Sequence, residues 1–481
     1  MPENTFSFSG FRDGHCHPLF AAREGVGPNL DDCTTVAAIQ DRLREYRAAN
    51  PDSPWIDCGS YEHTLAPEGR MLATWLDEAV ADIPVVVHAS DHHTIWVNSA
   101  ALAVAGLTET APTFKSASID VDADGKPTGV LREWDAMSVI YAHEPKPSID
   151  SDVAAIERAQ ERLLSHGIVA VQEAWIDPGM PEAYVAAVER GVLKLRVNLA
   201  PRIAPDSWRK DLEQAKAARS LVRAAGSELL TCNTVKIFID GVFSSGTALL
   251  AEPYCAGGHG DAIWETKELQ ALALAADSAG FQLHFHAIGD AAVSMALDAI
   301  DHIDLCNGFV DRRPVIAHAE LVSPADMVRM RRFGVIVCQQ PVWIQRDEQF
   351  ATTEAAIGVE RAGSLYPIAS LLNERVTVSF GSDWPVSDPN PLPGLVNALT
   401  RGASGSIEAI AVQEAITASQ AVYAYSTATA YQMGQESILA QDEVVLDADI
   451  TAADSATAGD LIGNAKVLSV RVAGKLVWSA A

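Results

Sequence analysis

Apolar runs alternate with amphipathic segments along the chain from about residue 151. Residues 151–166 place apolar side chains at helical spacing, which predicts a helix capped by Ser151 or Asp152. The next run, 167–171, predicts a buried strand. Further β-rich runs follow at 195–199, 235–239, 281–286, 314–318, 335–339 and 376–380, with helical patterns such as 267–279 and 324–333 between them. This alternation predicts the α/β class.

One more predicted strand precedes this series and ends in His15-Cys16-His17. It completes a set of eight, the number that closes a (β/α)8 barrel, or TIM barrel. His286 and His318 are 32 residues apart, about the length of one β/α unit. A doubly wound open sheet is the alternative, but that fold does not need eight strands. We therefore predict a TIM barrel.

Residues 19–150 do not follow this alternation. They contain a strand-like run at 85–88 and a hairpin over 119–131, with Asp124-Gly125 at its turn. We predict that 19–150 is an insertion after the first strand, forming a cap subdomain over the barrel mouth. The barrel then comprises 1–18 and 151–435. Short strands near the end of the chain predict a small β-sandwich remnant over 436–481.

Composition and charge restrict the partners and the compartment. The formal net charge of -28 argues against nucleic acid and anionic membranes as partners. The seven cysteines have no C-x-x-C spacing, which fits reduced thiols better than a disulfide framework or a thiolate zinc site. No signal segment or membrane-spanning apolar run is recognisable. We expect a cytoplasmic protein that acts on a small molecule, with a homodimer left open.

Candidate metal ligands stand at the strand ends of the predicted barrel. His15 and His17 share one face of their strand, because side chains alternate with period two. Barrel enzymes carry their chemistry at the carboxyl ends of strands, where His286, His318 and Asp383 also lie. Neutral imidazole is the commonest protein ligand for metal ions. The joint placement predicts a divalent metal site.

Each of these residues alone has a structural alternative. A single histidine is more often a hydrogen-bonded, half-buried side chain than a ligand, and Asp383 could cap a turn. Lys236, which lies within a predicted strand, could pair with Asp240 or extend outward. An ammonium beside a divalent cation is unfavourable. A desolvated lysine, however, loses its proton readily and can add carbon dioxide to become a carbamate, which could bridge two metals.

Five motifs lie at these positions: Asp13 to Pro18, Val235 to Gly241, His286 to Asp290, His318 to Glu320 and Gly381 to Asp383. Together they resemble the amidohydrolase superfamily, in particular the amidohydrolase 3 branch that includes N-substituted formamide deformylases. Segments 91–102 and 125–133 are also similar to that branch. The resemblance implies one or two divalent ions per chain, with Zn²⁺ expected. The ligands it implies are His15, His17, Lys236 as a bridging carbamate, His286, His318 and Asp383.

The chain departs from this resemblance near its ends. Family members usually carry β-strands before the first barrel strand, and these form a small sandwich with the C-terminal strands. Only 14 residues precede His15 here. We therefore expect that half of the sandwich to be absent.

The resulting hypothesis is hydrolysis of a C–N bond in an amide-like substrate, such as an N-substituted amide or formamide, a carbamate or a cyclic amide. A bound divalent metal lowers the pKa of water from ~15.7 to ~7. Asp383 would accept the water's proton and return it to the departing nitrogen. A non-hydrolytic metal lyase or isomerase on the same barrel and a metal-binding protein without catalysis are the alternatives.

Other polar residues are candidates for supporting roles. Three acidic residues are suited to orient the ligands: Asp240, Asp290 and Glu320. Four residues of the insertion are candidates for substrate contacts: His93, Trp96, Asn98 and Glu133. Glu173 is a further candidate for a polar contact. His284 shares a strand face with His286 but is expected one layer deeper, outside the ligand set.

Overall fold

The structure is a computed structural model that describes residues 5–30, 32–62, 65–66, 70–114, 117–405 and 407–480. The chain folds into two compact units. Unit 1 comprises 1–18 and 152–481, and unit 2 comprises 19–151. The placement of the insertion as a cap over the barrel mouth stays a prediction. Across the described ranges, no helix combines the length and the apolar character needed to cross a membrane.

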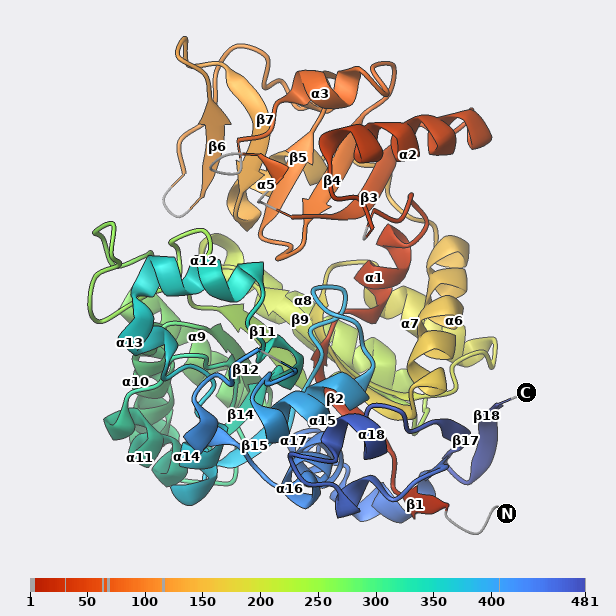
Figure 1. Cartoon of the computed structure of the whole chain (residues 1–481), viewed down its shortest axis with the longest axis vertical. Helices are drawn as coiled ribbons and strands as arrows, with labels where there is room; N and C mark the ends of the chain where they lie inside the picture. Colours follow the sequence, from red (N-terminus) through yellow and green to blue (C-terminus); the bar gives the residue numbers. More distant parts are fainter. Residues whose placement is uncertain are drawn as a thin grey trace. The chain divides into compact units, whose positions relative to one another are not determined.

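Unit 1 is built around eight parallel strands that form a nearly closed barrel (Figure 1). These are β2 (Phe11–Cys16), β8 (Ile168–Ile176), β9 (Arg196–Ile203), β11 (Thr234–Phe238), β12 (Gln282–Ala287), β13 (Val315–His318), β14 (Ile336–Gln339) and β15 (Thr377–Phe380). They pair in chain order from β2 to β15, and a short strand, β10 (Leu230–Thr231), adds to β9. The predicted TIM barrel is confirmed.

Two backbone hydrogen bonds join the carboxyl end of the first barrel strand to the segment that follows the last one. The N–H of Asp383 donates to the carbonyl of His15 at 2.7 Å, and the N–H of His17 donates to the carbonyl of Trp384, also at 2.7 Å. Gly381 permits this approach, because a Cβ there would lie 2.6 Å from the backbone nitrogen of His15. The candidate ligands of β2 and β15 therefore meet at one place.

Amphipathic helices alternate with the barrel strands and cover them from outside (Figure 1). In α6 (Ile149–Ser165), Val153, Ile156 and Leu163 are buried at helical spacing. The other helices of unit 1 are α7 (Met180–Glu189), α8 (Trp208–Ala224), α9 (Thr266–Ser278), α10 (Asp290–Asn307), α11 (Pro324–Phe333), α12 (Glu348–Ile357), α13 (Val359–Ala362), α14 (Ile368–Asn373), α15 (Pro391–Thr400), α16 (Ala418–Tyr423), α17 (Thr429–Gln432) and α18 (Ala458–Leu461).

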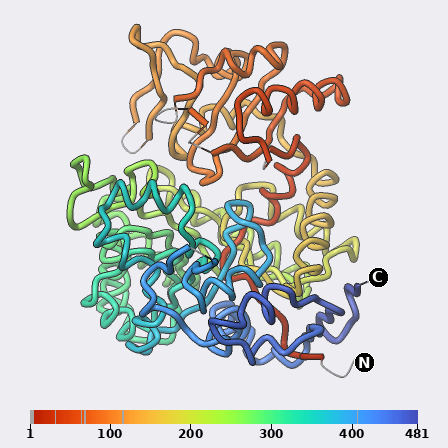
Figure 2. The backbone as a smooth tube through the Cα atoms, viewed as in Figure 1, coloured from red at the N-terminus to blue at the C-terminus, as the bar shows by residue number. Residues whose placement is uncertain are grey.

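Unit 1 also carries a four-stranded antiparallel sheet made from both ends of the chain. Its strands, in order, are β1 (Phe6–Phe8), β16 (Glu443–Leu446), β17 (Val467–Val472) and β18 (Lys475–Ser479). The N-terminal strand β1 therefore lies beside β16, which is more than 430 residues later in the chain, and the two segments are close in the backbone trace (Figure 2).

The position of β1 corrects one boundary of the predicted barrel. The sequence pattern assigns all of 1–18 to the barrel, but β1 pairs with β16, with Phe6 opposite Leu446 and Phe8 opposite Val444. An alternating Phe-Ser-Phe segment can present one face to a neighbouring strand. A strand before the first barrel strand therefore does contribute to the C-terminal sheet.

A buried ion network holds this sheet against the barrel. Asp442, just before β16, accepts hydrogen bonds from Arg12 of β2 at 2.8 Å and from Arg196 of β9 at 3.0 Å. All three side chains are buried. Because buried charges require partners, the network links the C-terminal sheet to two barrel strands.

Unit 2 is a mixed sheet in the order β3 (Ile56–Tyr61), β4 (Val85–Ala89), β5 (Thr94–Val97), β7 (Pro127–Arg132) and β6 (Ser118–Val121). Alternate residues of β4 enter two apolar clusters: Val85 and Val87 belong to one cluster, and Val86 belongs to the other. The sheet is therefore buried on both faces. The helices associated with this part of the chain are α1 (Pro18–Glu24), α2 (Val36–Ala49), α3 (Ala73–Asp77), α4 (Ser99–Val104) and α5 (Trp134–Tyr141).

Candidate metal centre

The candidate centre begins with the paired ends of β2 and β15. Asp13 of β2 is fully buried and accepts hydrogen bonds from the Ser382 N–H at 3.0 Å, the Ser382 hydroxyl at 2.5 Å and the His15 N–H at 3.1 Å. Burial raises the pKa of Asp13 to about 7 against these hydrogen bonds. Asp13 thus fixes the backbone of two segments, one at His15 and the other at Ser382, next to Asp383.

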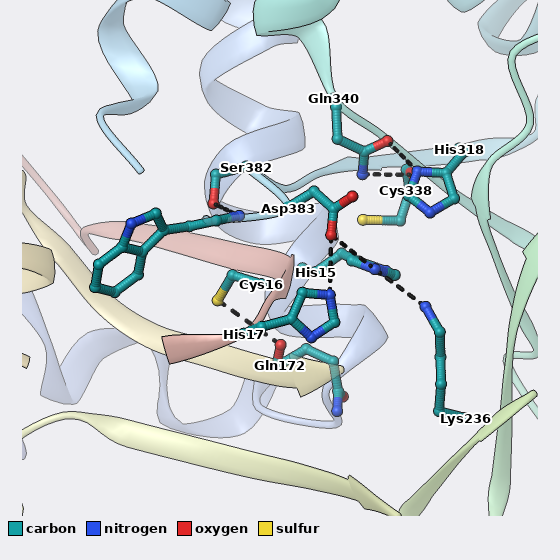
Figure 3. A network of polar contacts seen from close by, with 12 residues as sticks. His15, Cys16, His17, Gln172, Lys236, His318, Cys338, Gln340, Ser382 and Asp383 are labelled. Carbon is teal, nitrogen blue, oxygen red and sulfur yellow. Dashed lines mark hydrogen bonds and ion pairs between the residues drawn. The ribbon is translucent and has the colours of Figure 1, made fainter. Parts of the chain in front are cut away.

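Asp383 lies at the centre of the predicted ligand set (Figure 3). Its Oδ1 is 3.0 Å from His17 Nε2 and 3.3 Å from His15 Nε2. One donor atom from each of His15, His318 and Asp383 lies within 4.8 Å of the other two. The structure therefore brings together two imidazoles and a carboxylate from three barrel strands.

Lys236 and His286 extend this group along neighbouring strands. Lys236 Nζ, from β11, lies 3.1 Å from His15 Nε2. His286 is in β12, and its ring centroid lies 4.6 Å from that of His318. All six sequence-predicted positions consequently line one end of the barrel, although only His15, His318 and Asp383 meet as a compact donor triplet among the described residues.

Three of the imidazoles have protein groups at their Nδ1 atoms. His15 Nδ1 lies 2.7 Å from His284 Nε2, and His318 Nδ1 lies 2.9 Å from Gln340 Oε1. His286 Nδ1 lies 3.3 Å from Asp240 Oδ1. Outer contacts of this kind select the tautomer and direct the other ring nitrogen toward an ion. The arrangement therefore fits a metal that is bound through Nε2 atoms.

The charge states of these groups also fit a cation. Burial lowers the pKa of His15 and of His318 well below its ordinary value, which favours the neutral imidazole at both positions. Burial alone would raise the pKa of Asp383, but its contacts with His15 and His17 outweigh burial and lower that pKa well below its usual range. Burial lowers the pKa of Lys236 to about 7. The group thus offers neutral nitrogens, one carboxylate and a lysine that deprotonates near neutral pH.

Backbone strain marks two of these positions. His318 has φ of 71° and Asp383 has φ of 58°, and Ala319 follows with φ of 42°. Such left-handed conformations typically cost a non-glycine residue about 1–3 kcal/mol and cluster at functional sites. Left-handed backbone conformations thus coincide with two of the predicted ligands.

Three of the predicted supporting carboxylates have other partners. Asp290 accepts from the N–H groups of Ala251 and Ala291, so it caps the local backbone. Glu320 contacts Tyr366, and burial raises its pKa to about 7. The Glu173 carboxylate accepts from the Tyr184 hydroxyl at 2.5 Å. Of the acidic residues considered as supports, Asp240 is the one placed beside a predicted ligand.

The substrate-contact candidates all lie in unit 2. His93 Nδ1 is 2.8 Å from Glu133 Oε2, and both side chains are buried. Trp96 is fully buried, and its indole N–H donates to the carbonyl of Leu72. Asn98 accepts from the Ala101 N–H as the cap of α4 and donates to the carbonyls of Val80 and Ile83. Trp96 and Asn98 therefore have hydrogen-bond partners in the backbone of unit 2.

Sequence reasoning missed several supports of the centre. Asp13 precedes His15 by two residues and so shares its strand face, which was an available signal. His284 was visible as a same-face neighbour of His286, but not as the partner of His15. Gln340 follows β14 in Gln339-Gln340 and carries no recognisable spacing.

Comparison with known proteins agrees with this geometry. A model of the amidohydrolase family matches residues 4–477. The chain belongs to the amidohydrolase family. This confirms the predicted resemblance, and family membership supports a hydrolase that uses a divalent metal and acts on a small molecule.

Individual relatives of this amidohydrolase are distant. Protein LONG AFTER FAR-RED 3 of Arabidopsis thaliana is 29% identical over 421 residues, covering 83% of this chain and 69% of that protein. N-substituted formamide deformylase of Arthrobacter pascens is 24% identical over 414 residues, covering 82% and 73%. An uncharacterised metal-dependent hydrolase of Pyrococcus horikoshii OT3 has a similar fold, with a TM-score of 0.73 and 21% identity over 94% of this chain and 88% of that one.

Proposed function

We propose that this amidohydrolase cleaves a C–N bond of an amide-like substrate by attack of an activated water. The substrate class is an N-substituted amide or formamide, a carbamate or a cyclic amide. The observation that carries the proposal is the grouping of His15, His318 and Asp383 within 4.8 Å at the ends of three barrel strands. Imidazole and carboxylate donors suit Zn²⁺. We include His17, Lys236 and His286 as further ligands, for one or two ions per chain.

Lys236 takes part in this proposal as a carbamate. With a pKa lowered to about 7 by burial, a large share of its amine is uncharged at neutral pH. The uncharged Nζ attacks carbon dioxide, an N–C bond forms, and a proton leaves the nitrogen. The product is an anion where an ammonium would repel a cation. Its two oxygens could bridge two ions.

Asp383 is the proposed proton carrier. A bound divalent metal supplies a water whose pKa is ~7 rather than ~15.7 and polarises the substrate carbonyl. Asp383 takes a proton from the attacking water, whose oxygen bonds to the carbonyl carbon. The C–N bond then breaks, Asp383 gives the proton to the nitrogen, and an amine and an acid are released. His17 Nε2 lies 3.0 Å from Asp383 Oδ1, so these two proposed ligands are adjacent.

A substrate panel tests this proposal. Metal-loaded protein is assayed against N-substituted amides, formamides, carbamates and cyclic amides, and the released amine and acid are both quantified. For open-chain amides and formamides, hydrolysis predicts equal amounts of amine and acid. For a carbamate it predicts an amine with carbon dioxide and an alcohol, and for a cyclic amide it predicts one ring-opened product that carries both the amine and the acid. A lyase or isomerase would not give these products. Absence of turnover across the panel in a fully metallated sample would contradict the proposal. Substrate contact by the four candidates of unit 2 stays a prediction: His93, Trp96, Asn98 and Glu133.

A further inference from the structure

A second group of metal-binding side chains lies within unit 2. One donor atom from each of Glu24, His88 and His92 lies within 4.8 Å of the other two. The three come from α1, β4 and the turn after β4, so the fold rather than a local sequence motif brings them together. None of them belongs to the barrel centre described above. His88 is buried, and the side chains of Glu24 and His92 are 15% and 11% exposed.

His88 has the arrangement of a supported metal ligand. Its Nε2 lies 2.7 Å from Asp57 Oδ1, on the neighbouring strand β3. Its Nδ1 is buried and has no hydrogen-bond partner within the described part of the chain. A histidine held by a carboxylate at one ring nitrogen and open at the other is the common outer-contact pattern of metal-binding imidazoles.

Glu24 and His92 are held beside the His88 ring. His92 Nε2 lies 2.9 Å from Glu24 Oε2, and the rings of His88 and His92 are nearly parallel with centroids 5.3 Å apart. Glu24 also lies against the backbone of β3, where a Cβ on Gly59 would come within 1.8 Å of Glu24 Oε1. Gly59 therefore makes room for the carboxylate.

An ion-pair network without a metal explains these contacts less completely than a bound cation does, because it leaves one nitrogen of His88 unsatisfied. If His88 is neutral and donates to Asp57 through Nε2, the described residues offer no donor to its buried Nδ1 lone pair. If His88 is protonated, the same residues offer no acceptor to its Nδ1–H. Either state leaves a desolvated polar atom unsatisfied, which is costly. A cation beside His88, His92 and Glu24 would satisfy the lone pair and bind the adjacent carboxylate.

We propose that Glu24, His88 and His92 form a second divalent-cation site, separate from the barrel centre, with Asp57 orienting His88. Two imidazoles and one carboxylate match a three-ligand Zn²⁺ site with one position open to water. First-row divalent transition-metal ions bind well to a mixture of nitrogen and oxygen donors, whereas Mg²⁺ and Ca²⁺ prefer oxygen ligands alone. The expected occupant is therefore Zn²⁺ or a similar first-row ion.

Crystals of the full chain grown with Zn²⁺ test the site directly. Anomalous difference maps recorded above and below the zinc absorption edge should show a peak bounded by Glu24, His88 and His92. In solution, metal-depleted wild type titrated with Zn²⁺ should bind one ion more per chain than His92→Gln or Glu24→Gln. His143→Gln is the matched control, because His143 is an exposed histidine of the same unit and should leave stoichiometry unchanged.

Two variants are used in case one of them misfolds. If His92→Gln destabilises unit 2, Glu24→Gln still tests the site, because it retains the side-chain volume of Glu24. Circular dichroism confirms that each variant is folded before its metal is counted. No peak at the cluster, together with equal stoichiometry in wild type and folded variants, would overturn the site and identify an ion-pair network only. Neither readout depends on hydrolysis, so failure here leaves the proposed reaction untouched.

Discussion

His284 lies directly behind His15, with 2.7 Å between His284 Nε2 and His15 Nδ1. Both rings are buried, and the other nitrogen of His15 faces Lys236 and Asp383. His284 therefore acts on the proposed centre by fixing the orientation and tautomer of a ligand.

This contact predicts a positioning role that can be measured. His284→Ala should weaken metal binding by roughly 10–100-fold, the usual effect of removing an outer partner of a ligand. Calorimetric titration of the metal-depleted variant measures the change, and His284→Gln should recover part of it by keeping a polar group near Nδ1. Wild-type metal affinity in His284→Ala would show that His15 does not need this support.

Removal of Lys236 should empty the centre of metal. Lys236→Ala lacks the proposed bridging anion, so its metal content after purification should fall well below that of wild type. Acetate or propionate, which can enter the vacated space as carboxylates, should restore part of the metal content and turnover. Plasma mass spectrometry measures the bound ions. Unchanged metal content in the variant would eliminate the bridging role.

Carbamate formation should make reconstitution depend on bicarbonate and on pH. With a pKa of about 7, Lys236 is mainly uncharged above pH 7 and mainly protonated below it. The uncharged share falls from ~90% at pH 8 to ~10% at pH 6. Reloading of metal-depleted protein with Zn²⁺ at a fixed concentration of dissolved carbon dioxide should therefore slow as pH is lowered over this interval. If the rate of metal loading is the same with and without added bicarbonate, the result would argue against the carbamate.

The Arg12–Asp442–Arg196 network should be a major determinant of stability. Asp442→Asn leaves two buried guanidinium groups without their carboxylate, and we expect a loss of about 3–5 kcal/mol in the free energy of unfolding. Urea denaturation measures this loss. Glu213→Gln, which breaks an exposed pair with Lys216, should cost at most about 1 kcal/mol. Equal losses in the two variants would contradict the assigned role of Asp442.

The barrel was predictable because each strand carries its own local signal. Runs such as Val235 to Ile239 are rich in apolar and β-branched residues and are separated by amphipathic helices, so the element type follows from the short-range pattern. The strand β1 was not assigned to its sheet, because it has three residues and its partner strand lies far away in sequence. Pairing between strands so far apart in sequence produces no local periodic pattern from which it could be predicted.

The residues of the candidate site also divide into those that the sequence could predict and those that it could not. His15, His286 and His318 were predictable as a group, because strand ends of one barrel face one mouth. Gln340 and the His15–His284 contact were not, because they depend on side-chain packing between strands. Trp96 and Asn98 were chosen for their chemical character, but their partners are backbone groups of unit 2.

The most direct test of the central claim measures bound metal and turnover in the same samples. Wild type, chelated wild type, reloaded wild type and Asp383→Asn are compared by plasma mass spectrometry and by release of amine. The account predicts one or two divalent ions per wild-type chain, turnover that follows the ions removed and restored, and a turnover lower by ~10²–10⁴-fold in Asp383→Asn. A folded, metal-free protein that still hydrolyses its substrate would contradict it.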